Sequence, residues 1–461
     1  MEFDAVLLSR IQFAFTIAFH IIFPTFTIGL SAWIATLEGV WLKTGENRYH
    51  QLARFWTKVF AVSFGMGVVS GIVMSYQFGT NWSRFSEIAG NVVSPLIGYE
   101  VMTAFFLEAT FLGIMLFGWN RVPPWLHFTA SLAVAIGTLM SSFWILSANS
   151  WMQFPAGHVV RDGIIYPEDW LKVIFNPTFP LRLAHMVIAA YLTTAFVILG
   201  VGARYLLQKR EEKFARVMIR MGLGMALVLA PLQVFIGDAH GLDAAKYQPA
   251  KVAAIEAHWD GSKPGDLVLF ALPDEEQEKN HFEISIPNMA SLLITHELNG
   301  LFPGLKDFAK EDRPPVLIPF ASFRIMVGIG VWFLLICAWG AWRWWRGQLF
   351  EPGLYLTLAW WTWPLGFVAV LAGWFTAEVG RQPWVVTGLL RTADAASPVT
   401  ATQVAISLGL FFAVYGIVFS AGIYYINRLL HKGPSSIAAH EDKAAGAHRP
   451  ISAAGPIGAG E

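Results

Sequence analysis

The chain has 461 residues, of which 55% are hydrophobic and only 14% are charged, with 20 Trp and 36 Phe. Lysine plus arginine equals aspartate plus glutamate, 32 against 32, so the net charge predicts no nucleic acid and no acidic ligand as partner. The single cysteine, Cys337, excludes internal disulfides, cysteine-bound iron–sulfur clusters and a two-cysteine copper site, so any redox centre must be held by His, Met or carboxylate.

Long apolar segments recur along the chain, and a helix of about 20 such residues crosses a lipid bilayer. The sequence therefore predicts an all-α, polytopic membrane helix bundle of about nine transmembrane helices. The expected spans are 11–38, 57–80, 94–119, 125–147, 183–207, 217–237, 317–342, 353–374 and 402–427. The first span has no basic n-region and is too long for a signal peptide, so we expect it to be a retained helix.

Basic side chains are concentrated in alternate connections between these spans. They are Lys43, Arg48, Arg54, Lys58, Lys209, Arg210, Lys213, Arg216, Arg220, Arg343 and Arg346. By the positive-inside rule the side that carries them is cytoplasmic, so we expect the N-terminus outside and the C-terminus in the cytoplasm.

Four regions follow from this topology. Residues 1–237 hold transmembrane helices 1 to 6, residues 238–316 form an external loop, residues 317–427 hold helices 7 to 9, and residues 428–461 form a cytoplasmic tail. The long charged loop is either functional or a floppy insertion. The tail is rich in Ala, Gly and His and is predicted to be disordered.

Ionisable side chains at membrane depth are costly, which makes them candidates for function. His20 lies in AFHIIFP, and Glu100 and Glu108 lie in GYEVMTAFFLEATF. On a regular helix the two acids are about 12 Å apart along the axis and about 80° apart around it. A lone membrane His is also compatible with a simple packing hydrogen bond. Two acids in one span without a basic residue require a compensating partner, proton or cofactor.

A histidine and a methionine lie near the outer ends of two further spans. They are His185 in PLRLAHMVIAA and Met326 in ASFRIMVGIG. Such a pair can form the axial ligands of a low-spin haem b, although Met186 and Met221 are alternatives. Arg324 lies two residues before Met326, where it can pair with a haem propionate or extend to the membrane surface.

Under the predicted topology, the candidate residues share one depth. His20, Glu100, His185, Met326 and Glu378 lie in the outer half of the bilayer or at its outer edge. This common depth indicates a cluster of iron centres beneath the external loop. Glu108 lies deeper, where it could pass protons from the cytoplasmic side.

The stretch GWFTAEVGRQPW, residues 373–384, resembles the signature of subunit I of the cytochrome bd-type ubiquinol oxidases. The resemblance extends over nearly the whole chain and includes AFHIIFP, GYEVMTAFFLEATF and FRIMVGIG. It implies three cofactors, which are a low-spin haem b, a high-spin haem b and the chlorin haem d. It also implies a place in the bacterial cytoplasmic (inner) membrane, a second membrane subunit, and in some members a small single-helix subunit.

The resemblance assigns roles to individual positions. His20 and Glu378 match iron ligands of the two high-spin haems, without showing which takes which, and Glu100 matches a possible distal ligand. Glu108 lies beside that pair, and His185 and Met326 match the ligands of the low-spin haem b. The remaining matches are Arg324 and Arg381 as charge partners of the haem region and Trp374 and Trp384 as parts of its wall.

The external segment KYQPAKVAAIEAHW resembles the quinol-oxidising part of these proteins. Lys251 and Glu256 match the residues tied to quinol binding and deprotonation, a task that suits a carboxylate base. If the segment is helical, the two side chains point about 140° apart; two solvated surface charges are the alternative. The chain resembles the short-loop branch of the family, which includes the oxidases called cyanide-insensitive.

The function implied is oxidation of ubiquinol or menaquinol at the outer face and reduction of dioxygen to water, with protons drawn from the cytoplasm past Glu108. Proton motive force then arises from charge separation without a pump. A haem–copper oxidase is disfavoured because the spans lack clustered histidines. A membrane cytochrome b that only relays electrons leaves the three acids unexplained, and a transporter using buried acids leaves His185 and Met326 without a role.

Overall fold

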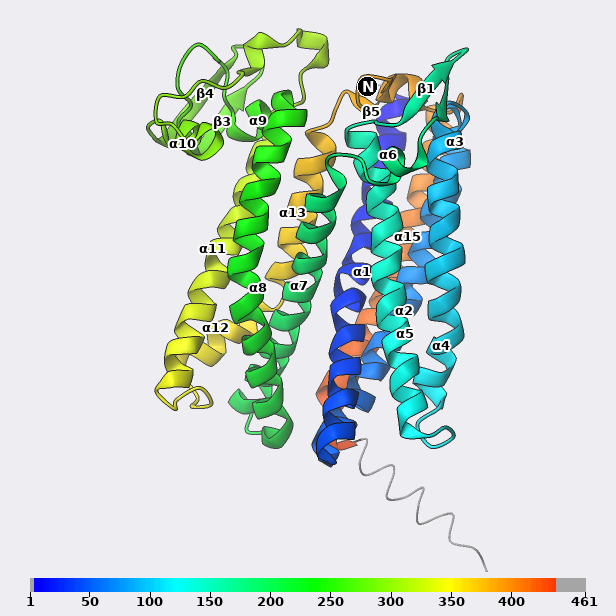
Figure 1. Ribbon diagram of the computed structural model, residues 1–461, viewed down its shortest axis with the longest axis vertical. Coiled ribbons are helices and arrows are strands. Elements are labelled where there is room, and N and C mark those ends of the chain that lie inside the picture. The colour runs from blue at the N-terminus through cyan, green and yellow to red at the C-terminus, as the bar shows by residue number, and fades with distance from the viewer. Residues whose placement is uncertain (1–3, 437–461) are drawn as a thin grey trace, which may run out of the picture.

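The computed structural model describes residues 4–436 and shows an elongated bundle of long helices capped at one end by short elements (Figure 1). The long helices are α1 (Ala5–Thr44), α2 (Asn47–Thr80), α3 (Ser83–Glu100), α4 (Phe106–Phe117), α5 (Pro124–Gln153), α7 (Phe179–Leu207), α8 (Glu212–Tyr247), α11 (Leu317–Trp345), α12 (Leu354–Thr362), α13 (Leu365–Val379) and α15 (Ala401–Lys432). We call the capped end the loop end and the opposite end the far end.

Within residues 4–436, eight helical segments are long and apolar enough to cross a membrane, with α3 and α4 counted as one segment. The pair α12 and α13, bent by 40°, makes a ninth if it is a single span. The prediction of an all-α membrane bundle with about nine spans is therefore confirmed. The bend falls at Trp363 and Pro364, and the missing N–H of a proline is a common cause of such a break.

Most helices are longer than predicted, because they continue past the apolar run into polar residues. Helix α5 reaches Gln153 and α13 reaches Val379, so Glu378 lies in the last helical turn and not beyond it. Helix α8 reaches Tyr247, so the first part of the predicted loop 238–316 is helical. At the other end of the chain α15 continues to Lys432, which corrects the predicted disorder of residues 428–432; residues 437–461 lie outside the described range.

The first and fifth spans lie at the centre of the bundle. Helix α1 contacts α2, α5, α7, α13 and α15, and α7 packs along α8. Buried side chains from both helices form the main apolar core, including Leu30, Ile34, Phe196 and Leu199. Gly222 of α8 allows a close approach to α7, because a Cβ there would lie 2.9 Å from the carbonyl oxygen of Ala195.

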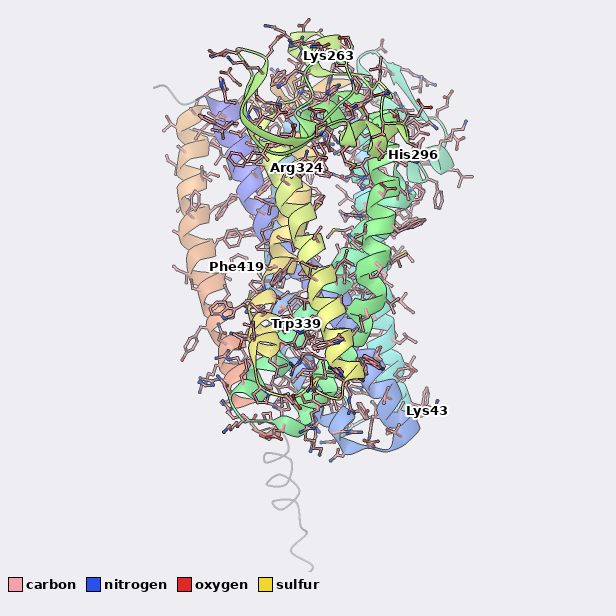
Figure 2. The ribbon with its side chains drawn as sticks, turned by 90° about the vertical axis from the view of Figure 1, so that its left-hand side faces the viewer. Lys43, Lys263, His296, Arg324, Trp339 and Phe419 are labelled. Carbon is pink, nitrogen blue, oxygen red and sulfur yellow. The ribbon has the colours of Figure 1, made fainter. Side chains whose placement is uncertain are left out.

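The polypeptide between α8 and α11 folds as a small cap on the loop end (Figures 1 and 2). It contains α9 (Pro249–Glu256), the antiparallel hairpin of β3 (Leu267–Asp274) and β4 (Lys279–Ile286), α10 (Met289–Thr295) and two 3-10 turns, Leu305–Asp307 and Lys310–Asp312. Ala253, Trp259, Val268 and Leu305 form a buried core in it. The alternative of a floppy insertion is therefore wrong.

Two further hairpins complete the loop end. The first pairs β1 (His158–Arg161) with β2 (Ile164–Pro167) and is followed by α6 (Trp170–Ile174). The second pairs β5 (Trp384–Val386) with β6 (Leu390–Arg391) and is followed by α14 (Thr392–Ala395). The N-terminal end of α1 lies at the same end, as the predicted topology requires (Figure 1).

The close approach at Gly222 can be tested with one methyl group. We expect Gly222→Ala to lower the free energy of unfolding by about 1–3 kcal/mol, because the added Cβ must push α7 away. The measurement is the thermal midpoint of the purified protein in detergent, followed by helical circular dichroism. Gly224→Ala is the matched control, since a Cβ there has open space; it should leave the midpoint unchanged or raised by its better helix propensity. Equal midpoints for the two variants would contradict the packing described.

Candidate functional site

The carboxylate of Glu378 is the centre of a buried polar network near the loop end. Its Oε1 accepts hydrogen bonds from Asn149 Nδ2 and Gln153 Nε2 of α5, each at 3.0 Å. Its Oε2 pairs with Arg381, one helical turn further along the chain. Arg381, expected from the resemblance to be a charge partner of the haem region, therefore contacts the side chain of Glu378 directly.

Gln153 joins this carboxylate to the cap. Its Oε1 accepts a hydrogen bond of 2.5 Å from Lys251 Nζ and one of 2.9 Å from Gln248 Nε2. Lys251 also donates to Gln248 Oε1 at 2.8 Å. Lys251 is only 6% exposed, and burial, together with the neighbouring positive charges of Arg182 and Arg381, lowers its pKa well below the usual lysine value. The side-chain amide of Gln153 therefore contacts both Lys251 of the quinol segment and the candidate ligand Glu378.

Glu256, the second predicted residue of the cap, has a different partner. Arg324 Nη2 of α11 donates to Glu256 Oε2 at 2.6 Å, and Arg324 Nε donates to the Val268 carbonyl oxygen at 2.5 Å. Burial raises the pKa of the Glu256 carboxyl group, and Arg324 opposes the rise. Lys251 and Glu256 are both buried on helix α9, so the alternative of two solvated surface charges is wrong.

His20 lies where α1 meets α2. Its Nδ1 is 3.0 Å from Ser70 Oγ, and a Cβ at Gly71 would lie 3.1 Å from its Cε1. Ser70 also donates to the carbonyl oxygens of Gly67 and Met66, which fixes the hydroxyl beside the ring. The glycine therefore lets the imidazole approach the backbone of α2 closely.

His185 and Met326 also lie against glycines of neighbouring helices. A Cβ at Gly237 of α8 would lie 3.3 Å from His185 Cε1, and one at Gly373 of α13 would lie 2.8 Å from Met326 Sδ. His185 Nε2 is 3.1 Å from Gln233 Nε2, whereas its buried Nδ1 has no hydrogen-bond partner. The two predicted ligands come from α7 and α11 and reach toward the helices α8 and α13.

The acids Glu100 and Glu108 both face α5. Glu100 Oε1 accepts a hydrogen bond of 2.7 Å from Ser141 Oγ, and Glu108 Cγ lies 2.6 Å from where a Cβ of Gly137 would be. Between the two acids the chain forms one π-helical turn, Val101–Phe105, so the angle expected for a regular helix does not apply. Their α5 partners are four residues apart, which places the two acids about one turn apart along that helix.

The two tryptophans predicted to wall the haem region lie on α13 and on β5. Trp374 is half-buried on α13, and Trp384 of β5 stacks under the guanidinium of Arg391 at 4.5 Å from the ring centroid. Arg391 in turn pairs with Asp312 of the cap. Trp384 thus helps to fasten the hairpin to the cap.

The neutral polar residues of α5 were not predicted, because only ionisable groups and methionines were candidates. Asn149 and Gln153 hold Glu378, and Ser141 holds Glu100. Arg182 of α7 was not predicted either; it is buried and donates from Nε to Ser150 Oγ at 3.0 Å and from Nη2 to Asn149. A run of Ser, Asn and Gln within an apolar span was the signal that could have revealed them.

The residues present suit a large prosthetic group with acidic substituents. Several buried polar atoms around Glu378 and His185 have no protein partner: Nε and Nη1 of Arg381, Nδ1 of His185, Oε1 of Gln233 and Oδ2 of Asp243. Unpaired buried donors are costly in protein, and the two on Arg381 match carboxylate acceptors such as propionates. Within residues 4–436 no three His, Cys, Asp or Glu side chains gather as a metal-ion site, whereas a haem iron needs only one or two protein ligands.

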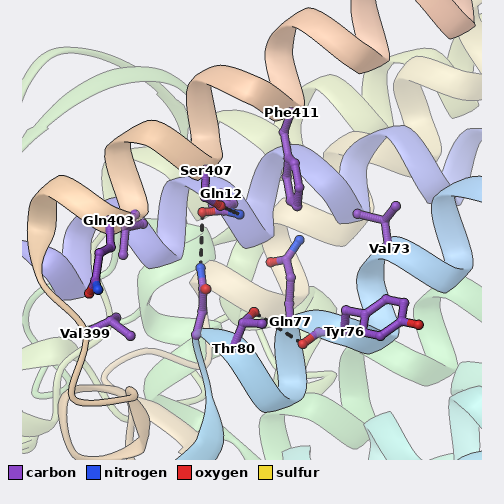
Figure 3. Close-up of a pocket in the computed structure, with 11 residues that line it drawn as sticks. Gln12, Val73, Tyr76, Gln77, Thr80, Val399, Gln403, Ser407 and Phe411 are labelled. Atoms are coloured by element: carbon purple, nitrogen blue, oxygen red, sulfur yellow. Dashed lines mark hydrogen bonds between the residues drawn. The ribbon is translucent and has the colours of Figure 1, made fainter.

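A separate pocket of about 450 Å³ lies between α1, α2 and α15 and contains none of the predicted residues among its lining side chains. Gln12, Gln77 and Ser407 point into it from these three helices (Figure 3). Gln12 Nε2 donates to Ser407 Oγ at 2.6 Å, and Gln77 Nε2 donates to Thr16 Oγ1 at 2.7 Å.

The fold and the site together define a multi-pass membrane protein with partly buried His, Met and Glu side chains suited to haem. The chain belongs to the family of cytochrome bd terminal oxidase subunit I, whose model matches residues 8–434. The family suggested by GWFTAEVGRQPW is therefore confirmed.

Individual relatives match over almost their full lengths. The chain is 32% identical to cytochrome bd-II ubiquinol oxidase subunit 1 of Escherichia coli, covering 94% of this chain and 98% of that protein. It is 36% identical to cytochrome bd ubiquinol oxidase subunit 1 of Bacillus subtilis, covering 93% and 94%. The solved structure of bd oxidase from Geobacillus thermodenitrificans has a TM-score of 0.86 at 32% identity and covers 94% of this chain and 100% of its own.

Proposed function

We propose that this chain is the subunit of a terminal oxidase that oxidises quinol at the loop end of the bundle and contributes the haem site at which dioxygen is reduced to water. Family membership makes it part of a quinol:oxygen oxidoreductase. The observation that carries the residue-level proposal is the shared amide of Gln153, which joins Lys251 of the cap to Glu378 of the bundle. This arrangement favours the oxidase over an electron-relay cytochrome or a transporter.

The assignments keep the residues expected from the sequence. His185 and Met326 would hold the low-spin haem b, and His20 and Glu378 would each hold one of the high-spin haem b and haem d irons, with Glu100 as a possible distal ligand. Haem iron would carry electrons from quinol and bind and reduce dioxygen. Arg381 would meet a haem propionate, and its two unpaired donors support this role. Trp374 and Trp384 would line the same region.

The cap would bind ubiquinol or menaquinol. Lys251 would orient the ring oxygen, and Glu256 would accept a proton as the quinol is oxidised. The guanidinium group of Arg324 already donates to Glu256 and to the cap backbone. In this proposal Arg324 therefore positions the Glu256 carboxylate and lowers its pKa. Oxidation of two quinols releases four protons and four electrons. Reduction of one dioxygen to two waters takes up the same numbers.

Charge separation would follow from the two ends of the bundle. Protons are released at the loop end, which we propose to be the outer face with the N-terminus, and are taken up past Glu108 from the cytoplasmic far end. Proton motive force then needs no pump. The complex would include a second membrane subunit, with a small single-helix subunit in addition, in the bacterial cytoplasmic membrane. Residues 248–316 would be the quinol-binding cap between the two sets of spans.

The cofactor proposal is tested by the dithionite-reduced minus air-oxidised absorption spectrum of the purified complex. We expect haem b bands beside a far-red chlorin band, together with quinol-driven oxygen uptake. Haem b bands alone would contradict the assignment of haem d, and a spectrum without haem would contradict the whole site.

A single substitution tests the low-spin site. We expect Met326→Leu to abolish or shift the low-spin haem b band and to slow quinol oxidation, because leucine fills the space beside Gly373 but offers no sulfur ligand. Met221→Leu is the matched control, since Met221 lies on α8 toward a different pocket. An unchanged low-spin spectrum in Met326→Leu would show that another residue binds the iron.

The quinol base predicts a pH dependence. Only the carboxylate form of Glu256 accepts a proton, so activity should fall as the pH drops through its raised pKa. Arg324→Gln removes a charge that lowers this pKa, so the acid limb should move to higher pH. Glu256→Ala should reduce quinol-driven oxygen uptake by about tenfold to a hundredfold.

The exposed acid Glu297 of the same cap provides the control. Glu297→Ala should leave both the rate and the pH profile of oxygen uptake unchanged. Undiminished uptake in Glu256→Ala, measured with the same quinol, would remove Glu256 from the mechanism.

A further inference from the structure

A buried acid and a buried histidine meet at the far end of the bundle, on the far-end side of Glu108. Glu38 of α1 is 0% exposed and His127 of α5 is 2% exposed, and His127 Nδ1 lies 2.8 Å from Glu38 Oε2. Ser131, one turn further along α5, donates to Glu38 Oε1 at 2.7 Å. Such a pair is costly to bury unless its proton and hydrogen bonds are complete.

The contacts fix how many protons the pair holds. His127 Nε2 is 3.2 Å from the Met115 carbonyl oxygen, which can only accept, so Nε2 carries a proton. The contact between Nδ1 and the carboxylate then contains one more proton, whichever partner holds it. Glu38 and His127 are therefore neutral as a pair, and the two side chains share one proton between Nδ1 and the carboxylate.

The pair lies just inside the far-end surface. Trp119 packs at a tilt on His127 with ring centroids 3.9 Å apart, and the same indole meets His50, at 5.3 Å between centroids, and Arg54, at 5.4 Å. Lys43, five residues beyond Glu38 on α1, marks the far end opposite the cap (Figure 2). The pair thus lies beside a half-buried indole near the far end of the bundle.

In the other direction, α1 and α5 meet through a pair of hydroxyl groups, each of which also has a backbone carbonyl oxygen, of Ile28 or Ala135, as an acceptor. Ser31 Oγ and Thr138 Oγ1 lie 3.2 Å apart, and Gly137, next to Thr138, is the residue against which Glu108 packs. Seven residues, or about 10 Å of helix, separate this hydroxyl pair from Ser131 and Glu38. The positions between them on the same helix faces are Ala35 and Ala135, both small and buried.

We propose that Glu38 and His127 form the proton-exchanging pair that supplies Glu108 from the far end. The proton shared by the pair passes through water beside Ala35 and Ala135 and the hydroxyls of Ser31 and Thr138 to the Glu108 carboxylate. The pair then regains a proton from the aqueous phase, and no other bond forms or breaks. This inference rests on the proposed oxidase function, in which Glu108 receives the protons used to make water.

The test separates proton exchange from a purely structural clamp. Glu38→Gln keeps a carbonyl acceptor for Ser131 and an amide donor for His127 Nδ1 but cannot exchange a proton. In the intact oxidase complex we expect oxygen uptake with quinol, and proton uptake followed with a pH-indicator dye after mixing the reduced complex with oxygen, to slow by about tenfold or more. The haem spectrum, the rate of haem reduction by quinol and the thermal midpoint should stay unchanged.

Two variants of the intervening alanine provide a second readout. Ala135→Leu should place a bulky apolar side chain on the proposed path and slow proton uptake, whereas Ala135→Ser should leave it near the wild-type rate. Wild-type proton uptake in Glu38→Gln, or equal rates in the two Ala135 variants, would overturn the inference. If the wild-type complex showed no quinol-driven oxygen uptake, the proposed function itself would fail, and that outcome is distinct from the other two.

Discussion

Compensation of buried charge is the constraint on which this structure depends. Hydrocarbon offers no water to a charged side chain, so each buried ion needs partners from neighbouring helices. Glu378 meets this need with Arg381 and two amides of α5, and Arg182 meets it with Asn149 and Ser150 of the same helix. The position of α13 relative to α5 and α7 is therefore set by polar contacts as well as by apolar packing.

Helix α5 contacts four acidic side chains along its length. From the far end to the loop end its side chains or backbone meet Glu38, Glu108, Glu100 and Glu378 in turn, through His127, Gly137, Ser141 and Asn149. The distance from His127 to Gln153 is about 39 Å of helix, which is close to the full thickness of a membrane with its headgroups. One helix thus contacts acids at both surfaces and at the depths between them.

The number of spans could be predicted from sequence because each requires a long apolar run, which is visible without any tertiary information. The ligand candidates could be predicted because His20, His185 and Glu378 are rare residue types in such runs. The contributions of Asn149, Gln153 and Ser141 could not, since neutral polar residues are tolerated in membrane helices and only their partners show what they do. The π-helical turn between Glu100 and Glu108 depends on tertiary packing, so a regular-helix estimate of their angle had to fail.

Two of the contacts that join the cap to the bundle differ in chemistry. Lys251 reaches Glu378 through the neutral amide of Gln153, whereas Glu256 meets Arg324 in a direct ion pair. The first contact fixes the position of Lys251 relative to Glu378. It passes no proton between them, because an amide has a fixed protonation state. The second responds to charge, because protonation of Glu256 weakens its attraction to Arg324, which lies two residues from Met326. A proton accepted by Glu256 would therefore change the ion pair with Arg324 on α11, the helix that carries the proposed haem ligand Met326. The geometry at Glu378 would stay the same.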